Sequence, residues 1–334
     1  MKTITMPGPA KSKEILGLLA CAFLMKFITR YLVLAVLVVS ISSVAQDKPP
    51  ATADQGASQT ADLRENPSAA ASENTGKAAE AKPAQASAES TEELTKAAQN
   101  PVASLISVPF QNNNNFGIGP YDRSQDVLYI QPVIPMALNK NWNLITRIIQ
   151  PVVYQPYPNA TTGGAYGFGD MVPQFYFSPR NSGKVIWGAG PQLVIPTATN
   201  DILGAGKLSL GPALVVLTQP KPWSIGVIVN NVWSVAGSGS RPPVNQMLMQ
   251  PFINYNMQKG WYLTTSPYIT ANWRASSGNT WVVPVGGGLG RITKLGSQPV
   301  NISAQFFGNA AHPPGTSSWS MRLQFVLLYP KAAK

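Results

Sequence analysis

Apolar and polar residues alternate one by one through much of the chain after residue 100, which is the pattern of strands with one apolar face. In residues 261–273 the odd positions are mainly large and apolar, whereas the even positions carry tyrosine, threonine, serine and asparagine. Each such run is about 11 residues long, the length that a tilted strand needs to cross a bilayer. The last run has the same form, with an apolar face made of Trp319, Met321, Leu323, Phe325, Leu327 and Tyr329.

Runs of this kind recur about twelve times, and an even number of strands is expected of bacterial barrels. The pattern therefore predicts an all-β protein, an antiparallel transmembrane β-barrel. The predicted strands lie near residues 103–112, 125–138, 142–154, 169–178, 184–196, 207–218, 223–235, 245–257, 261–273, 281–292, 299–309 and 319–330.

The predicted connections alternate between short and long, as in outer-membrane barrels, and both termini fall on the short side. The asparagines at 112–115 and residues 162–164 are interpreted as loop. The short connections are 139–141, 180–183, 219–222, 258–260 and 294–297; the long ones lie near 113–124, 155–168, 197–206, 236–244, 274–280 and 310–318.

The eight tryptophans fall at strand ends, where amphipathic rings form girdles at the two membrane interfaces. A secreted soluble β-protein, the alternative, would place them in mid-strand at its core. Trp142, Trp187, Trp223 and Trp261 follow short connections, whereas Trp233, Trp273, Trp281 and Trp319 adjoin long ones.

Prolines and glycines interrupt several predicted strands. Each proline removes a ladder hydrogen bond, so we expect bulges or kinks at them. The glycines at 286–290 are not followed by the Gly-Lys-Ser/Thr of a phosphate loop, and we interpret them as a tightly curved strand or a place where an internal loop approaches the wall. The prolines are Pro132, Pro151, Pro173, Pro191, Pro212, Pro251, Pro267 and Pro284.

The N-terminal region has a different chemistry. Residues 1–45 are expected to be an extension followed by a signal peptide starting at Met25 and cleaved before Gln46, which leaves a mature chain without cysteine. Residues 46–100 are rich in alanine and polar residues, which predicts a largely disordered linker, with a plug or periplasmic tether as the alternative. Within it, Ser90–Glu93 forms a capping box that predicts a short helix ending before Pro101.

Charge excludes several function classes. Only 12% of residues are charged, the net charge is +11, and the cations after residue 101 are scattered singly, so nucleic-acid binding is not expected.

The lone histidine, His312, lies in a predicted loop, so we expect neither catalysis nor a cofactor. No metal site is expected either: the acids of this region have no calcium-loop spacing, and we expect rim ion pairs with Arg123 or Lys207 instead; these acids are Asp122, Asp126, Asp170 and Asp201.

The alternation also assigns residues to the lumen, which is predicted to be rich in amides and hydroxyls. The candidate solute contacts are Arg147, Gln174, Tyr176, Gln192, Asn230, Tyr262, Thr264, Tyr268, Gln305 and Arg322, and further lumen positions include Asn143, Ser224, Gln250, Asn254, Ser266, Asn301, Ser303 and Gln324. Neutral polar groups interleaved with tyrosines suit small polar or aromatic solutes, and unbalanced arginines favour anions. Alternatively, these side chains fill and hydrate a closed barrel.

Several motifs resemble a known family. Residues 100–112, 131–135, 167–175, 195–199 and 208–212 are similar to segments of bacterial outer-membrane proteins of the MetA-pathway phenol-degradation family, some of which carry the label neuromedin U. The resemblance covers roughly residues 95–330. It implies a barrel and a transport role linked to aromatic compounds, and it brings no catalytic residues.

We therefore expect a monomeric barrel, residues 101–334, in the bacterial outer membrane, in contact with the lipid bilayer and lipopolysaccharide. The expected function is passive transport of small hydrophobic or aromatic solutes. Two alternatives stay open: a general, anion-preferring pore, and a closed barrel whose loops contact partners.

Overall fold

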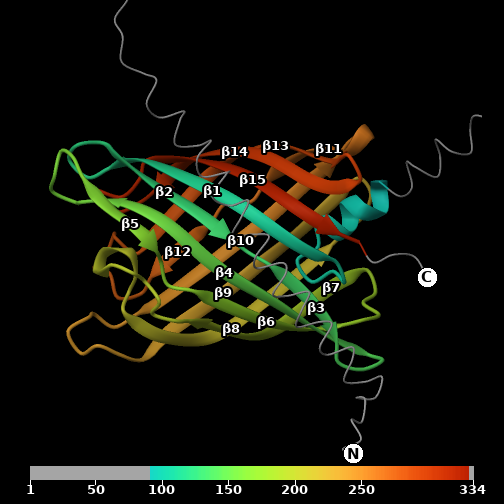
Figure 1. Cartoon of the computed structure of the whole chain (residues 1–334), viewed down its shortest axis with the longest axis horizontal. Helices are drawn as coiled ribbons and strands as arrows, with labels where there is room; N and C mark the ends of the chain where they lie inside the picture. Colours follow the sequence, from blue (N-terminus) through green and yellow to red (C-terminus); the bar gives the residue numbers. More distant parts are fainter. Residues whose placement is uncertain (1–90, 331–334) are drawn as a thin grey trace, which may run out of the picture. The chain divides into compact units, whose positions relative to one another are not determined.

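The computed structural model describes residues 91–330, and these form a closed barrel of antiparallel strands (Figure 1). Each strand pairs with its neighbour in sequence, and the barrel closes where the last strand, β15, pairs with β1. Three wall strands are each interrupted near their middle, so the fifteen strand segments make twelve wall strands. The predicted all-β transmembrane barrel is confirmed.

The strand segments are β1 (Ile106–Ile118), β2 (Arg123–Ile130), β3 (Val133–Ala137), β4 (Trp142–Pro156), β5 (Gly164–Phe168), β6 (Val172–Pro179), β7 (Val185–Val194), β8 (Lys207–Thr218), β9 (Trp223–Gly237), β10 (Asn245–Asn256), β11 (Trp261–Thr265), β12 (Ile269–Asn272), β13 (Trp281–Leu295), β14 (Gln298–Ala311) and β15 (Trp319–Tyr329). Two short 3₁₀ turns, η1 (Asp201–Leu203) and η2 (Gln258–Gly260), lie in connections. Each of the twelve predicted runs corresponds to one wall strand, so the alternation of apolar and polar residues predicted the location of every strand.

The first strand corrects the prediction for the asparagine run. Residues 112–115 are not loop but part of β1, and the connection to β2 is the tight 119–122 rather than a long loop. Asparagine is usually depleted in strands. Here, however, its side chains form hydrogen bonds with side chains of the neighbouring strands. Asn113 accepts from Arg322 at 3.1 Å, and Asn115 donates to Gln125 at 2.7 Å. These hydrogen bonds satisfy the amides within the sheet.

The remaining connections keep the predicted asymmetry. One end of the barrel has the tight connections 138–141, 180–184, 219–222, 257–260 and 296–297, and the other has 157–163, 195–206, 238–244, 273–280 and 312–318. Gly164, predicted as loop, begins β5, because this strand starts before the expected residue 169. The expected rim ion pairs with Arg123 and Lys207 are also wrong for the described residues: both side chains bond to backbone carbonyls of nearby loops instead.

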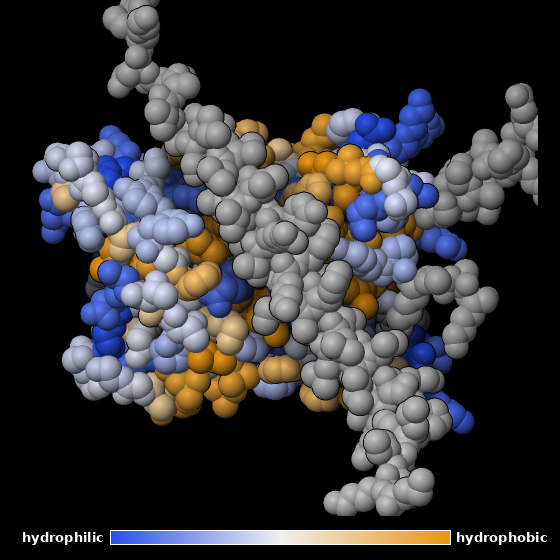
Figure 2. Space-filling model, viewed as in Figure 1, coloured by the Kyte–Doolittle hydropathy of each residue, from blue (hydrophilic) through white to orange (hydrophobic). Residues whose placement is uncertain are grey.

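The outer surface carries an apolar belt bounded by aromatic side chains. Figure 2 shows hydrophobic residues gathered on the wall and hydrophilic residues toward both ends of the barrel. All eight tryptophans are exposed on this surface, and two pairs stack edge to face across neighbouring strands: Trp142 with Trp187 at 5.8 Å and Trp273 with Trp281 at 5.5 Å. The two predicted girdles are confirmed, as lipid contact of the wall requires.

Interruptions of the wall coincide only in part with the prolines. Pro132 lies between β2 and β3, Pro267 lies between β11 and β12, and Pro284 lies at a register shift of β13. The third break, between β5 and β6, contains no proline. The other five prolines lie in continuous strands with unbroken register, so the bulges expected there are absent from the described wall. A proline loses its N–H but its carbonyl still accepts, which costs the ladder a single bond.

A segment that precedes the first strand occupies the tight-turn end of the lumen. Residues 91–98 form a helix, coloured blue-green in Figure 1, which confirms the helix predicted before Pro101; Ser90 lies outside the described residues. Residues 91–100, which composition assigns to the linker, are therefore packed on the barrel. Val102 and Leu105 are 5% and 7% exposed and belong to two inward-facing apolar clusters of the wall. We call residues 91–105 the plug segment.

Polar contacts fasten the plug segment to the wall. Glu92 forms an ion pair with Lys221 at 2.6 Å, Gln99 Nε2 donates to Asn256 Oδ1 at 2.8 Å, and Asn143 Nδ2 donates to Ser104 Oγ at 3.1 Å. Among the described residues, no helix is long and apolar enough to cross a membrane. The strand register and the plug segment together define the lumen.

Candidate solute pathway in the lumen

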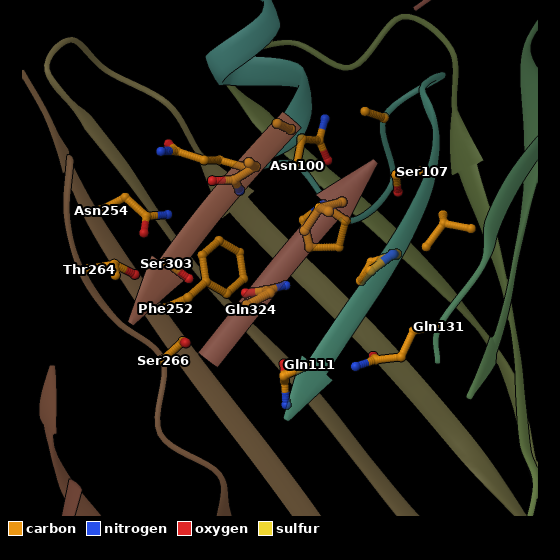
Figure 3. Close-up of a pocket in the computed structure, with 18 of the residues that line it drawn as sticks. Asn100, Ser107, Gln111, Gln131, Phe252, Asn254, Thr264, Ser266, Ser303 and Gln324 are labelled. Atoms are coloured by element: carbon orange, nitrogen blue, oxygen red, sulfur yellow. The ribbon is translucent and has the colours of Figure 1, made fainter. Parts of the chain in front are cut away.

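Beneath the plug segment lies a first cavity of about 180 Å³ (Figure 3). In Figure 3 the helix and the turn that follows it stand above the cavity, and amide and hydroxyl side chains project into it from the wall. Phe252 and Tyr262 supply aromatic surface, while Ala97, Ala98 and Ala103 of the plug segment form part of its lining. The first cavity is therefore closed on one side by the chain's own N-terminal segment.

A second cavity of about 200 Å³ lies deeper in the lumen. Its lining combines apolar and aromatic side chains with a set of amides, and it includes no residue of the plug segment. The lining residues are Tyr129, Gln131, Arg147, Ile149, Val172, Gln174, Gln192, Ile228, Asn230, Leu248, Gln250 and Tyr268.

The two cavities share four lining residues: Gln131, Arg147, Ile228 and Gln250. These side chains come from the β2–β3 break and from β4, β9 and β10, so they lie around the lumen rather than on one wall. The Arg147 guanidinium donates a hydrogen bond to Oε1 of Gln131, which lies on the neighbouring segment of the wall. The cavities are thus adjacent compartments of one pathway, and the four residues form the boundary between them.

A chain of amides runs along the wall of the second cavity. Gln174 Nε2 donates to Gln192 Oε1 at 2.5 Å, and Gln192 Nε2 donates to Asn230 Oδ1 at 3.2 Å. Gln174 is 4% exposed and its Oε1 has no hydrogen-bond partner. Arg147 lies directly across from Gln174 in the register of β4 and β6. This wall therefore presents a cation beside an amide whose oxygen accepts no hydrogen bond.

Arg322, the other lumen arginine, is enclosed by aromatic rings. Its guanidinium carbon lies 4.0 Å from the ring centre of Tyr268 and 5.1 Å from that of Phe307. Its Nε donates to Asn113 Oδ1 at 3.1 Å, and its Nη1 donates to the Ser266 carbonyl at 2.6 Å. The side chain is 5% exposed. These contacts fix the position of Tyr268, whose ring lines the second cavity.

The ten predicted contact residues all face inward, and eight of them line a cavity. Tyr262, Thr264 and Gln305 line the first cavity, Gln174, Gln192, Asn230 and Tyr268 line the second, and Arg147 lines both. The other two are placed differently: Tyr176 is 2% exposed within an apolar cluster with Val102, and Arg322 stands behind Tyr268. Whether these residues contact a solute stays a prediction.

Sequence reasoning missed part of the lining. The alternation in 125–138 places Tyr129 and Gln131 on the inward face, yet neither is among the predicted solute contacts. The contribution of residues 97–103 was also missed. Val102 and Leu105 were the available signal, because two apolar residues directly after the polar segment favour packing against a larger surface.

No protein-family model matches the sequence, and neither does any curated protein. The fold is similar to the COG4313 outer membrane channel from Pseudomonas putida F1, with a TM-score of 0.53 and 14% identity over 67% of this chain and 94% of that chain. Weaker likenesses are to the CymD monoaromatic hydrocarbon channel (TM-score 0.39, 9% identity, 71% and 90% covered) and to outer membrane phospholipase A from Escherichia coli (0.37, 12%, 67% and 97%).

At 14% identity, the likeness to the COG4313 channel bears on the fold alone. The resemblance to the phenol-degradation family is therefore left as a prediction. A closed twelve-stranded barrel with an apolar belt and two tryptophan girdles is a protein of the bacterial outer membrane, as expected from the strand pattern.

Proposed function

We propose that this barrel passes small hydrophobic or aromatic solutes across the outer membrane by passive diffusion. The observation that carries the proposal is the pair of adjoining cavities of about 180 and 200 Å³. A dry cavity of about 150 Å³ holds one benzene molecule, so each compartment has room for a single ring. A pore for large hydrophilic solutes needs a wider, continuous lumen.

The lining supports this choice of solute. Tyr129, Ile149, Val172, Leu248 and Tyr268 present apolar and aromatic surface to the second cavity, with amides between them. Binding sites for small molecules commonly combine a mainly apolar wall with a few polar groups that orient the ligand. The solved protein that shares this fold is an outer membrane channel, which is compatible with a transport role for this barrel.

The position of the plug segment helps to distinguish the proposed function from its two alternatives, the general anion-preferring pore and the closed barrel. With residues 97–103 against the first cavity, movement through the tight-turn end requires this segment to shift. A general anion-preferring pore would rely on Arg147 and on an open junction. A closed barrel with interacting loops would keep the plug segment in place. We further propose that the protein acts as a monomer surrounded by phospholipid and lipopolysaccharide.

The test is uptake by liposomes carrying the refolded mature protein, with charged aromatic tracers, sugars and salts of similar size. Neutral phenols are unsuitable tracers because they cross bare bilayers unaided. Ile228→Trp, at the junction of the cavities, should reduce aromatic uptake at least about tenfold if solutes use this route, since overpacking closes the junction. Val229→Trp is the matched control, because the next residue of β9 faces the outside of the barrel.

Each outcome has a distinct meaning. Selective aromatic uptake that Ile228→Trp blocks and Val229→Trp spares supports the proposal. Uptake of every small solute indicates the general pore. Absence of uptake by wild-type protein overturns the transport function and leaves the closed barrel.

A further inference from the structure

We propose that the second cavity binds a single-ring aromatic acid, with the carboxylate held between Arg147 and Gln174. This inference rests on the proposed function and specifies its substrate class. Arg147 and Gln174 face each other across neighbouring strands, and the rest of the cavity has the size and lining for one ring.

The first argument is the uncompensated charge of Arg147. None of the acidic residues among residues 91–330 lines either cavity. The hydrogen bond of Arg147 to Gln131 is made to a neutral amide, so it leaves the positive charge of the guanidinium unbalanced. The accessible lining of the second cavity is largely apolar, and a cation in such surroundings is costly unless an anion pairs with it. A solute carboxylate supplies that anion, and its two oxygens match the planar donors of a guanidinium.

The second argument is the unused hydrogen-bonding capacity of the Gln174 side chain. Its Oε1 is buried without a hydrogen-bond partner, and its Nε2 begins the amide chain to Gln192 and Asn230. When a side-chain amide rotates by a half turn, its oxygen and its NH₂ group exchange places, and the two groups differ little in shape. The whole chain can reverse in this way, because every link is an amide. Gln174 would then present an N–H to a carboxylate oxygen already paired with Arg147.

The third argument concerns the ring of the solute. Tyr129 and Tyr268 line the cavity together with aliphatic side chains, and aromatic rings pack well against such surfaces. Arg322 stacks on Tyr268 at 4.0 Å and keeps this ring in place. The cavity of about 200 Å³ exceeds the roughly 150 Å³ that benzene occupies by enough to admit one carboxylate.

A neutral hydroxyl is the competing recognition group. It would donate to Gln174 Oε1 and accept from Arg147, but it would leave the guanidinium charge uncompensated. The charge balance therefore favours the acid. Benzoate and benzamide distinguish the two cases, because they share the ring and the planar substituent but differ in charge, and acetate tests the need for the ring.

The experiment measures binding of these three probes to the refolded mature protein by calorimetry in detergent. We expect benzoate to bind at least about tenfold more tightly than benzamide or acetate, as charge-assisted hydrogen bonds imply. Arg147→Gln should remove this preference. Gln174→Glu should remove it as well, because the new carboxylate pairs with Arg147 in place of the solute.

Gln155→Glu is the matched control, since Gln155 lies on the same face of β4 as Arg147, eight residues further along the strand, and lines neither cavity. It adds the same charge to this face and should change benzoate affinity by less than about threefold, because the added charge lies well beyond the Debye length of about 10 Å from Arg147. Equal affinity of wild-type protein for benzoate and benzamide overturns the proposal, and so does full benzoate binding by folded Arg147→Gln.

Liposome uptake separates this inference from the proposed function. If charged aromatic amines are taken up while benzoate neither binds nor passes, transport stands and the acid-binding site is wrong. If benzoate binds with the expected dependence on Arg147 but no solute is taken up, the site stands and transport is wrong.

Discussion

The ring of Tyr262 lies against Gly290 on the neighbouring strand, so close that a Cβ on residue 290 would stand 2.1 Å from the ring. The Tyr262 hydroxyl donates a 2.6 Å hydrogen bond to Asn301 Oδ1 on the strand beyond. The tyrosine thus spans the inner face of β13, and glycine leaves the space that it needs. The approach expected at the glycine run is made by this side chain rather than by an internal loop.

Gly290→Ala should therefore destabilise the barrel. The added methyl group would push the Tyr262 ring away from Asn301, and such overpacking costs about 1–3 kcal/mol. Urea unfolding in lipid vesicles measures the change. Gly308→Ala is the control, because a Cβ at residue 308 of β14 meets no atom within 4 Å. Equal stability of the two variants would contradict the packing argument.

The direction in which each strand residue points could be predicted from the sequence, whereas distances inside the lumen could not. Leu323 and Arg322 are neighbours in sequence, yet 44% of Leu323 and 5% of Arg322 is exposed, as strict alternation requires. This local rule located all the wall strands and the direction of the candidate contacts. It says nothing of distances across the lumen, so it could not show that Tyr176 belongs to a buried apolar cluster with Val102 instead of lining a cavity.

The plug segment and the asparagine run were harder to predict for a related reason. Composition describes a residue type on average, whereas these residues are ordered by specific distant partners. Gln99 bonds to Asn256, and Asn113 bonds to Arg322, more than 150 positions apart in each case. Pairings this remote appear only once the barrel is closed.

Leu323→Arg should impair folding, because this side chain faces lipid near the middle of the wall. A cation there costs about 2–4 kcal/mol at the bilayer midplane. Refolding yield in vesicles, read from heat-modifiable migration on gels, measures the effect. Gln324→Arg should fold normally, since its side chain enters the first cavity. If both variants folded equally well, the assignment of faces in β15 would be wrong.

Acid should loosen the plug segment through Glu92. The hydrogen bond from Lys221 is the main cause that lowers the pKa of Glu92 below its ordinary 4.5. A carboxyl with a lowered pKa stabilises the folded arrangement above the ordinary value, and this contribution disappears as the pH falls through the lowered pKa. We expect single-channel conductance to rise as the pH falls well below 4.5.

The Glu92 carboxylate is also exposed, so high salt should weaken its ion pair with Lys221 and act in the same direction. Glu92→Gln should raise conductance at neutral pH and remove the acid response of this site. Glu93→Gln removes the same charge from the next residue and serves as control, because Glu93 forms neither of the ion pairs seen in residues 91–330. An identical pH response in wild-type protein and Glu92→Gln would refute this role.

Val102→Asn should displace the plug segment more strongly. Val102 is 5% exposed in a cluster with Ile145 and Tyr176, and burying an unpaired amide there costs about 1–3 kcal/mol. The expected result is a higher single-channel conductance with unchanged heat-modifiable migration of the barrel. Ser104→Asn is the control, because Ser104 is exposed and Asn143 still finds an acceptor there. Unchanged conductance in folded Val102→Asn would mean that the plug segment does not obstruct the lumen, and the route would then lie beside it.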